Sequence, residues 1–312
     1  MSFAKTFSCF STGGQNLAGP LPSELSHIPF LQSISLGYND FTGTLPIEFA
    51  EMRHLVNLEV NGNQLDGSIP PEFWKTLTLQ NFNVVENTIT GTLSTEVGFL
   101  TNLKGLHLSD NLLQGTLPTE IGNLQFLSYA RADGNQLTGS IPTQLGSLRL
   151  LQELWLHENL LSGTIPTEFG LLAEIGELRL FRNRIYGTIP DQLWDNKTQL
   201  KRLDLQDMLL SGTLSTRIGD LQKLETIRLR RNRLTGTIPT EMAKLRSLRL
   251  AWFHLNQFSG SVPLQLCSRV RPGFLEFLNA DCGPDGAPAQ ECECCHGCCD
   301  RNTELCQLTD DN

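Results

Sequence analysis

A glycine returns along this sequence at an almost constant interval of 24 residues, and no other feature constrains the fold as strongly. Around each glycine the sequence reads Asn-x-Leu-x-Gly-x-Ile-Pro with conservative replacements, and one interval has 25 residues. A segment of this length cannot bury its own apolar side, so it must stack on its neighbours in a solenoid that presents one continuous surface. The glycines are Gly19, Gly43, Gly67, Gly91, Gly115, Gly139, Gly163, Gly187, Gly212, Gly236 and Gly260.

One repeat, LQELWLHENLLSGTIP at residues 151–166, shows how the others are built. Leu154 and Leu156 alternate with polar or aromatic residues, which predicts a short strand with one buried face. Asn159 closes the following turn because its amide both donates and accepts hydrogen bonds, and stacked asparagines are expected to form a ladder. A glycine and a proline mark a second bend, after which the chain returns along the outer side.

A few repeats depart from this pattern. Gln15 and Met208 replace the ladder asparagine, and Ser94 and Ser215 replace the proline. Met208 should leave a gap in the ladder, in the repeat that also carries one extra residue within residues 191–199. We expect this insertion to lie in an outer loop, because insertions into solenoids map to the connections between strands.

The repeat also predicts the domain organisation. A globular chain of 312 residues would suggest about two domains, whereas the repeat predicts one solenoid over residues 1–280, with about 11 repeats and a degenerate last strand. Residues 281–312 hold eight acidic side chains and one arginine, and they read as an acidic, disulfide-rich cap and tail. The chain has a net charge of −9, so the solenoid is nearly neutral and lacks the basic footprint of a nucleic-acid-binding protein.

Eight of the nine cysteines lie after residue 266, and this density predicts a disulfide framework formed in an oxidising compartment. Such a cross-linked cap would cover the last apolar layer of the solenoid. A thiolate-rich metal site that includes His296 is the alternative, although we expect no metal. Cys9 is left over and is expected to be a small buried thiol. The disulfide candidates are Cys267, Cys282, Cys292, Cys294, Cys295, Cys298, Cys299 and Cys306.

The expected location is outside the cell or at its surface. The first residues, MSFAKTFSCFST, lack the apolar core of a signal peptide, and no apolar run is long enough to span a membrane. Because disulfides require export, we expect sequence upstream of this chain to supply a signal or a membrane anchor. Asn196 begins a glycosylation acceptor, Asn-Lys-Thr, which fits this location.

The segment LSGTIPTEFGLLAEIGELRLFRN resembles the plant-type leucine-rich repeats of receptor-like kinase ectodomains and polygalacturonase-inhibiting proteins. The ending CECCHGCCD is similar to the cysteine-rich terminus of diatom leucine-rich-repeat proteins. The resemblance implies an α/β repeat solenoid, a right-handed superhelix with short parallel strands on the concave face. It also implies 3-10, short helical or loop segments on the convex face, and a second sheet at the LxGxIP stretch.

The same resemblance implies a receptor-like ectodomain that recognises a protein, peptide or anionic glycan on its concave face. A secreted or wall-associated binder that inhibits an extracellular enzyme is the alternative. No kinase, nucleophile-elbow, phosphate-loop or zinc-helix motif is present, so we expect no enzymatic activity and no cofactor. His107, His157 and His254 lie in different repeats, too scattered for a shared metal site.

Outward strand positions define columns across the expected concave face, with neighbours ~4.8 Å apart. The first column reads Ser35, Glu59, Asn83, His107, Arg131, Trp155, Arg179, Asp204, Arg228, Trp252 and Glu276. The next reads Gly37, Asn61, Val85, Ser109, Asp133, His157, Phe181, Gln206, Arg230, His254 and Leu278. Aromatic and cationic residues dominate from Trp155 onward.

Exposed aromatic residues grouped with arginines have the composition of interaction hot spots, and they predict a binding strip. Its arginines would bind carboxylate, sulfate or phosphate groups, while the rings stack on sugar or peptide faces. Cross-strand ion pairing of the arginines with Asp204 and Asp207 is the alternative explanation, and the two can coexist. The predicted strip consists of Trp155, His157, Arg179, Phe181, Arg182, Arg228, Arg230, Trp252 and His254.

Overall fold

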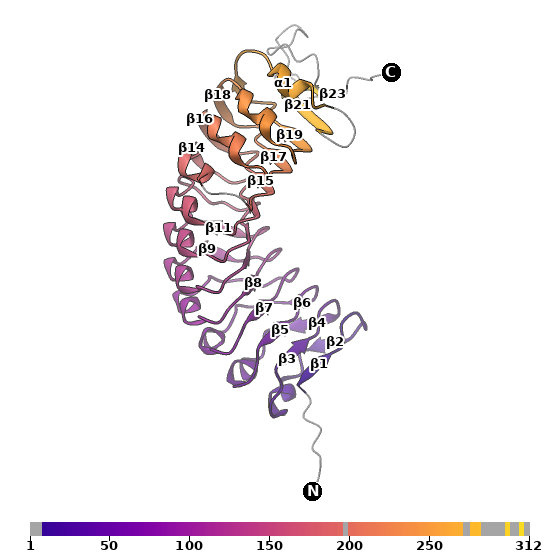
Figure 1. Ribbon diagram of the computed structural model, residues 1–312. Helices are drawn as coiled ribbons and strands as arrows, with labels where there is room; N and C mark the ends of the chain where they lie inside the picture. The colour runs from indigo at the N-terminus through magenta and orange to yellow at the C-terminus, as the bar shows by residue number, and fades with distance from the viewer. Residues whose placement is uncertain (1–7, 196–198, 271–274, 282–296, 300–305, 309–312) are drawn as a thin grey trace. The chain divides into compact units, whose positions relative to one another are not determined.

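The computed structural model describes residues 8–195, 199–270, 275–281, 297–299 and 306–308. The chain forms two compact units, Met1–Leu160 and Leu161–Asn312, called unit 1 and unit 2 below. In each unit, successive repeats stack so that short strands lie on one side and 3-10 turns on the other (Figure 1). This is the stacked-repeat solenoid that the 24-residue period predicts.

The main sheet of unit 1 is parallel, and its strands follow the order of the chain. Equivalent residues of successive repeats pair directly, as Ile34 does with Leu58 and Ala130 with Leu154. The middle residue of each strand from β3 onward is buried, while the outer two residues point to the open face of the sheet. The strands are β1 (Cys9–Ser11), β3 (Ser33–Ser35), β5 (Asn57–Glu59), β7 (Asn81–Asn83), β8 (Gly105–His107), β10 (Tyr129–Arg131) and β12 (Glu153–Trp155).

The main sheet of unit 2 is built in the same way, except that its last two strands pair antiparallel. The strands are β13 (Glu177–Arg179), β15 (Arg202–Asp204), β17 (Thr226–Arg228), β19 (Leu250–Trp252), β21 (Phe277–Asp281), β22 (Gly297–Cys299) and β23 (Cys306–Leu308). Arg228 pairs with both Asp204 and Trp252, so these three side chains share one column of the open face.

The 3-10 turns follow the second bend of each repeat, where the preceding proline fixes φ and ends the extended segment. Each turn buries one or two apolar side chains against the strands, such as Phe169 in η7. Unit 1 contains η1 (Ser23–His27), η2 (Ile47–Glu51), η3 (Pro71–Lys75), η4 (Thr95–Phe99), η5 (Thr119–Asn123) and η6 (Thr143–Ser147). Unit 2 contains η7 (Thr167–Leu171), η8 (Asp191–Trp194), η9 (Thr216–Asp220), η10 (Thr240–Lys244) and the helix α1 (Leu264–Cys267).

A second set of short parallel strands forms at or just before the repeat glycine, as expected, except in the repeats of Gly91 and Gly163. In unit 1 these are β2 (Ala18–Pro20), β4 (Asp40–Gly43) and β6 (Gln64–Leu65), and separately β9 (Gln114–Thr116) and β11 (Gln136–Thr138). In unit 2 they are β14 (Tyr186–Thr188), β16 (Leu209–Thr213), β18 (Arg233–Gly236) and β20 (Gln257–Phe258). Each repeat glycine has a positive φ, for example 83° at Gly187, which explains why glycine recurs there.

The predicted asparagine ladder is present. Asn135 Nδ2 donates to the carbonyl of Leu108 in the preceding repeat (2.9 Å), and its Oδ1 accepts from the peptide N–H of Leu113 (2.9 Å). Met208 is buried in the position of a ladder asparagine but offers no amide, so the predicted gap is real. The sequence did not suggest a role for the two serines that replace proline. Ser94 Oγ and Ser215 Oγ accept hydrogen bonds from peptide N–H groups and cap η4 and η9.

Two expectations were wrong. Cys9 is exposed and is not a buried thiol, because the alternation in β1 turns Phe10 toward the core. In the last strand, Asn279 and not Glu276 pairs beside Trp252, and Leu278 is buried rather than outward. The last repeat is longer than 24 residues because the helix α1 and further residues replace a 3-10 turn.

The predicted cap is described only in part. Cys267 is disulfide-bonded, whereas Cys282, Cys292, Cys294, Cys295 and Asn196 lie outside the described residues. The structure describes only the backbone at Cys298, Cys299 and Cys306. The domain boundary near residue 280 therefore stays a prediction. None of the helices that the structure describes has the length and apolar character needed to cross a bilayer.

Candidate functional site

The nine residues of the predicted strip are divided between the two units. Trp155 and His157 belong to unit 1, and the other residues belong to unit 2. The main strands position them, because residues that alternate with the buried leucines point to the open face.

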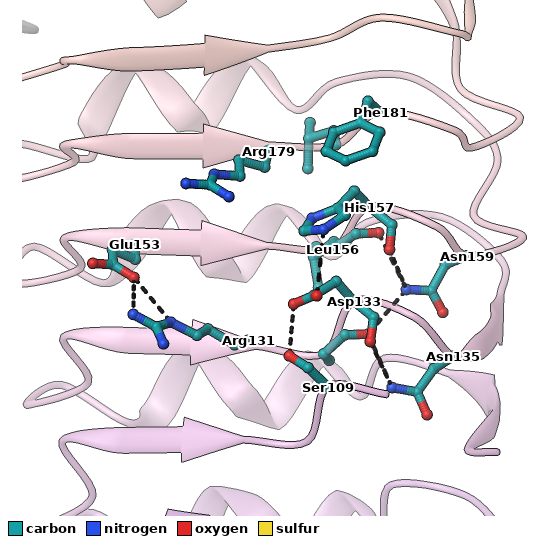
Figure 2. A network of polar contacts seen from close by, with 12 residues as sticks. Ser109, Arg131, Asp133, Asn135, Glu153, Leu156, His157, Asn159, Arg179 and Phe181 are labelled. Carbon is teal, nitrogen blue, oxygen red and sulfur yellow. Dashed lines mark hydrogen bonds and ion pairs between the residues drawn. The ribbon is translucent and has the colours of Figure 1, made fainter. Parts of the chain in front are cut away.

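In unit 1, Trp155 forms part of a cluster around Arg131. The guanidinium Nε and one terminal nitrogen of Arg131 donate to Glu153 Oε2, at 2.9 and 2.5 Å (Figure 2). The guanidinium carbon lies 4.0 Å from the centroid of the Trp155 ring and 6.0 Å from that of Tyr129. Because a carboxylate and two rings already hold Arg131, this arginine orders the surface around Trp155.

His157 lies over a buried carboxylate. Ser109 Oγ donates to Asp133 Oδ1 (2.6 Å), and His157 Nε2 lies 3.3 Å from Asp133 Oδ2 (Figure 2). A hydrolytic triad requires the hydroxyl to bond to the imidazole, but here the carboxylate stands between the two groups. The arrangement therefore joins three repeats and does not activate a nucleophile.

In unit 2, Arg228 and Arg230 flank the ring of Trp252. Arg228 donates to Asp204 Oδ2 (3.0 Å), and its guanidinium carbon lies 4.8 Å from the indole centroid, while that of Arg230 lies at 5.2 Å. The side chains of both arginines are about 30% exposed, and neither Nε has a hydrogen-bond partner among the described residues. We call Arg228, Arg230 and Trp252 the arginine–tryptophan cluster.

Ion pairs account for part of the positive charge, as the alternative explanation expects. Asp204 pairs with Arg228, and Asp207 lies 3.6 Å from Arg230 and 3.7 Å from Arg231. Arg179, however, pairs with Glu177 of its own strand (2.6 Å). The cross-strand pairs thus orient the arginines of the cluster, whose side chains stay partly exposed.

Burial corrects the expected position of His254. Its side chain was expected to point to solvent, but the residue is 3% exposed. Burial, followed by the charges of Arg230 and Arg231, lowers the pKa of His254 to about 4, so the imidazole is neutral. His254 supports the ring of Trp252, at 6.2 Å between centroids, and does not face a ligand.

Phe181 and Arg182 complete the predicted strip. Phe181 is half-buried and Arg182 is exposed. Asp204 was predicted to be outward but is fully buried, and burial raises the pKa of its carboxyl although the hydrogen bond from Arg228 opposes this. Among the described residues, no three His, Cys, Asp or Glu side chains form a group that could hold a metal ion.

The comparisons with known proteins agree with the repeat architecture. A model of the family Leucine Rich Repeat matches residues 54–76, 102–124, 150–172 and 223–245. The chain is similar to the crystal structure of the Arabidopsis receptor kinase HAESA in complex with the peptide hormone IDA and the co-receptor SERK1. The TM-score is 0.82 and the identity 28%, over 96% of this chain and 51% of that chain.

Two further solved structures are similar. A TDR receptor has a TM-score of 0.74 and 28% identity, over 87% of this chain and 51% of that chain. A plant ice-binding protein has a TM-score of 0.66 and 26% identity, over 75% of this chain and 78% of that chain. The chain thus spans about half the length of the two receptors. The comparison with curated protein sequences gives no match.

Proposed function

Because the chain is a leucine-rich-repeat protein with plant-type repeats, we propose that it binds a peptide or protein segment on the open face of its main strands. The structure of HAESA contains a peptide hormone, and that of PEPR1 contains AtPEP1. These receptors extend well beyond the length that this chain covers. Ligand binding by this chain is therefore a proposal that rests on its own surface.

The arginine–tryptophan cluster of unit 2 carries this proposal. Stacked on one indole, Arg228 and Arg230 keep their guanidinium groups in place, so little side-chain entropy is lost when a ligand binds. Each guanidinium can form a charge-assisted pair with a carboxylate, and the indole adds apolar contact. The cluster therefore favours an acidic peptide segment with an apolar or aromatic residue next to its carboxylate.

The test is a selection from a displayed library of random peptides on the purified chain, followed by calorimetry with the selected peptides. Alanine at both Arg228 and Arg230 should weaken binding by roughly 10- to 100-fold, because hydrogen bonds to charged groups contribute about 1.5–3 kcal/mol. The matched control replaces two exposed arginines of the same unit, Arg184, which precedes β14, and Arg233, which begins β18, and should bind like the original chain. Equal losses in both double variants would show that only net charge matters and would reject the proposed site.

We also propose a location outside the cell or at its surface, supported by the similarity to receptor ectodomains and by the disulfide at Cys267. If the selected peptides match a segment of an extracellular enzyme, and the chain inhibits that enzyme, the chain is a secreted inhibitor and not a receptor-like module. In either case the ligand binds on the open face of the main sheet.

A second candidate function is ice binding, and one observation favours it. Every residue that follows a repeat glycine from Gly43 to Gly260 is an exposed serine or threonine. Across the second sheets, hydroxyl residues pair directly, as Thr116 does with Thr138 and Thr213 with Thr235. The threonine γ-methyl groups lie against the glycine of the next repeat, which restricts their rotamers and keeps the hydroxyl array regular.

The similar plant ice-binding protein makes this candidate directly testable. Ice-recrystallisation assays should show inhibition by the chain and its loss when Thr213 and Thr237 are replaced by lysine. The double variant of Arg228 and Arg230 should retain inhibition, because it alters the other sheet. No effect of the chain on ice growth would reject this candidate and leave the peptide-binding proposal standing.

A further inference from the structure

Gly105 lies in the lining of a hollow on the open face of unit 1. Unlike the repeat glycines, it does not have a positive φ, so its backbone conformation does not require glycine. A Cβ at this position would lie 2.6 Å from Asn81 Oδ1 and 2.6 Å from His107 Nε2. The missing side chain therefore allows both polar groups to approach the backbone of β8.

The hollow has a volume of about 350 Å³, and residues of β5, β7, β8 and β10 form its wall. This volume is within the range of sites for small ligands, roughly 300–1,000 Å³. The first residue of each neighbouring strand is larger than glycine: Asn81 in β7 and Tyr129 in β10. The hollow is thus centred on the repeat of Gly105 and is not a groove along the whole sheet.

Three side chains at the hollow have no polar partner among the residues that the structure describes. They are the amides of Asn57 and Gln80 and the ammonium group of Lys104. Asn81 donates through Nδ2 to Glu59 (3.0 Å), which leaves its carbonyl oxygen directed over Gly105. Amide groups that both donate and accept match the hydroxyl groups of a sugar.

Lys104 supplies the uncompensated positive charge of the hollow. The lining also includes Arg131, which is paired with Glu153. His107 is neutral because burial, followed by the charge of Arg131, lowers its pKa to about 4. The hollow therefore favours a single anionic group next to uncharged polar groups.

One wall of the hollow is flat. The rings of His107 and Tyr129 stack with 6.3 Å between centroids and 25° between planes. Tyr129 directs its hydroxyl to Gln152 (3.1 Å), away from the hollow, and keeps the ring in place. A planar aromatic surface of this kind packs against the apolar face of a sugar ring.

We propose that this hollow binds a carboxylated sugar, with the carboxylate on Lys104 and the hydroxyl groups on the amides of Asn57, Gln80 and Asn81. The sugar ring packs on Tyr129. A peptide carboxylate would use Lys104 but leave the amides and the ring without matching groups. The site lies in unit 1 and is independent of the arginine–tryptophan cluster.

Calorimetry of the full chain with oligomers of glucuronic acid tests this proposal, and oligomers of glucose with the same linkage are the neutral match. The acidic oligomer should bind roughly 10- to 100-fold more tightly than the neutral one, because its carboxylate forms charge-assisted hydrogen bonds. Lys104→Gln should weaken binding of the acidic oligomer by about the same factor. Lys201→Gln is the matched control, since Lys201 precedes β15 as Lys104 precedes β8 and is equally exposed, and it should bind like the original chain.

Gly105→Ala provides a second variant, because the added methyl group would occupy the space over β8 that Asn81 and His107 now fill. It should weaken binding of the acidic oligomer without changing the far-ultraviolet circular dichroism. Unchanged binding in both Lys104→Gln and Gly105→Ala would overturn the proposal. So would binding of a peptide carboxylate in the absence of any binding of glucuronic acid. Neither result affects the peptide test of Arg228 and Arg230, so the two proposals fail separately.

Discussion

Each ladder asparagine satisfies peptide groups in two repeats at once. Asn135 donates to three carbonyl groups and accepts from one peptide N–H, and all of these contacts are buried. This explains why the residue recurs and why its position could be predicted from the sequence: no other side chain of its size carries a donor and an acceptor on one planar group.

Replacing Asn135 by alanine should lower the free energy of unfolding by about 2–4 kcal/mol, because several buried peptide groups lose their partners. Urea unfolding monitored by circular dichroism measures this change. Asn102→Ala is the control, since Asn102 forms one exposed hydrogen bond to Leu77 (2.8 Å) and should cost less than about 1 kcal/mol. Equal costs would contradict the role of the ladder.

Two histidines, the half-buried His107 and the buried His254, make stability depend on pH. Burial lowers the pKa of His107 and of His254 to about 4, and nearby arginines add to this effect, whereas an unfolded histidine titrates near 6.5. Between pH ~6.5 and about 4, the two imidazoles therefore stay unprotonated in the folded chain, whereas they bind protons in the unfolded chain. Stability is fully present above pH ~6.5 and falls as the pH drops toward 4, by up to about 3 kcal/mol per histidine.

Denaturant unfolding near pH 7.5 and near pH 5 measures this loss. A variant with asparagine at residues 107 and 254 should show a smaller difference between the two conditions. An identical difference in the variant would mean that other groups cause the pH dependence.

Among the elements, the strands and 3-10 turns follow the period closely, while the last strand does not. The register of β3 to β12 in unit 1 is the one that the glycine spacing predicts. The error at β21 arose because no repeated residue marks the longer connection through α1. The 24-residue period predicts the strand register only in repeats that keep this length.

Near the end of the described solenoid, a carboxylate accepts peptide hydrogen bonds that backbone carbonyls accept in the preceding repeat, where the N–H groups of Arg231 and Asn232 donate to His254 and Leu255. Asp281 accepts hydrogen bonds from the peptide N–H groups of Leu255 and Asn256, and it is 2% exposed. Leu255 has a positive φ of 58°, which an L-residue adopts only when contacts hold it. The sequence suggested only an acidic tail residue at this position.

Asp281→Ala should therefore increase hydrogen exchange at Leu255, Asn256 and the strands β19 and β21, while unit 1 keeps its protection. Hydrogen exchange followed by mass spectrometry resolves these segments. Asp220→Ala removes an exposed carboxylate from η9 of the same unit and should leave the pattern unchanged. Uniform loss of protection throughout unit 2 in both variants would contradict a local role.

On the scale of the whole molecule, the chain presents two kinds of surface. The main sheets carry rings, arginines and carboxylates on their open faces, and the second sheets carry serine and threonine hydroxyls. The residues on each face could be predicted from alternation alone. Their burial could not, because it depends on the neighbours: Arg230 and Trp252 are partly exposed, while His254 between them and the backbone is covered.

The sequence did not predict the hollow at Gly105, because its existence also depends on the neighbouring side chains. A glycine within a strand gives no signal of a cavity unless the side chains around it are known, and here Asn81 and His107 define the space. The cluster at Arg228 was found because its aromatic and cationic residues occupy two neighbouring columns, which sequence spacing reveals directly.

Oxidative footprinting of unit 2 tests the central claim, that the open face of the main sheet binds the ligand. Trp252 lies in the arginine–tryptophan cluster, and Tyr186, which is 53% exposed, lies on the second sheet. A peptide selected on the chain should reduce the oxidation rate of Trp252 and leave that of Tyr186 unchanged. Protection of Tyr186 with no change at Trp252 would contradict the account and place the binding surface on the second sheet.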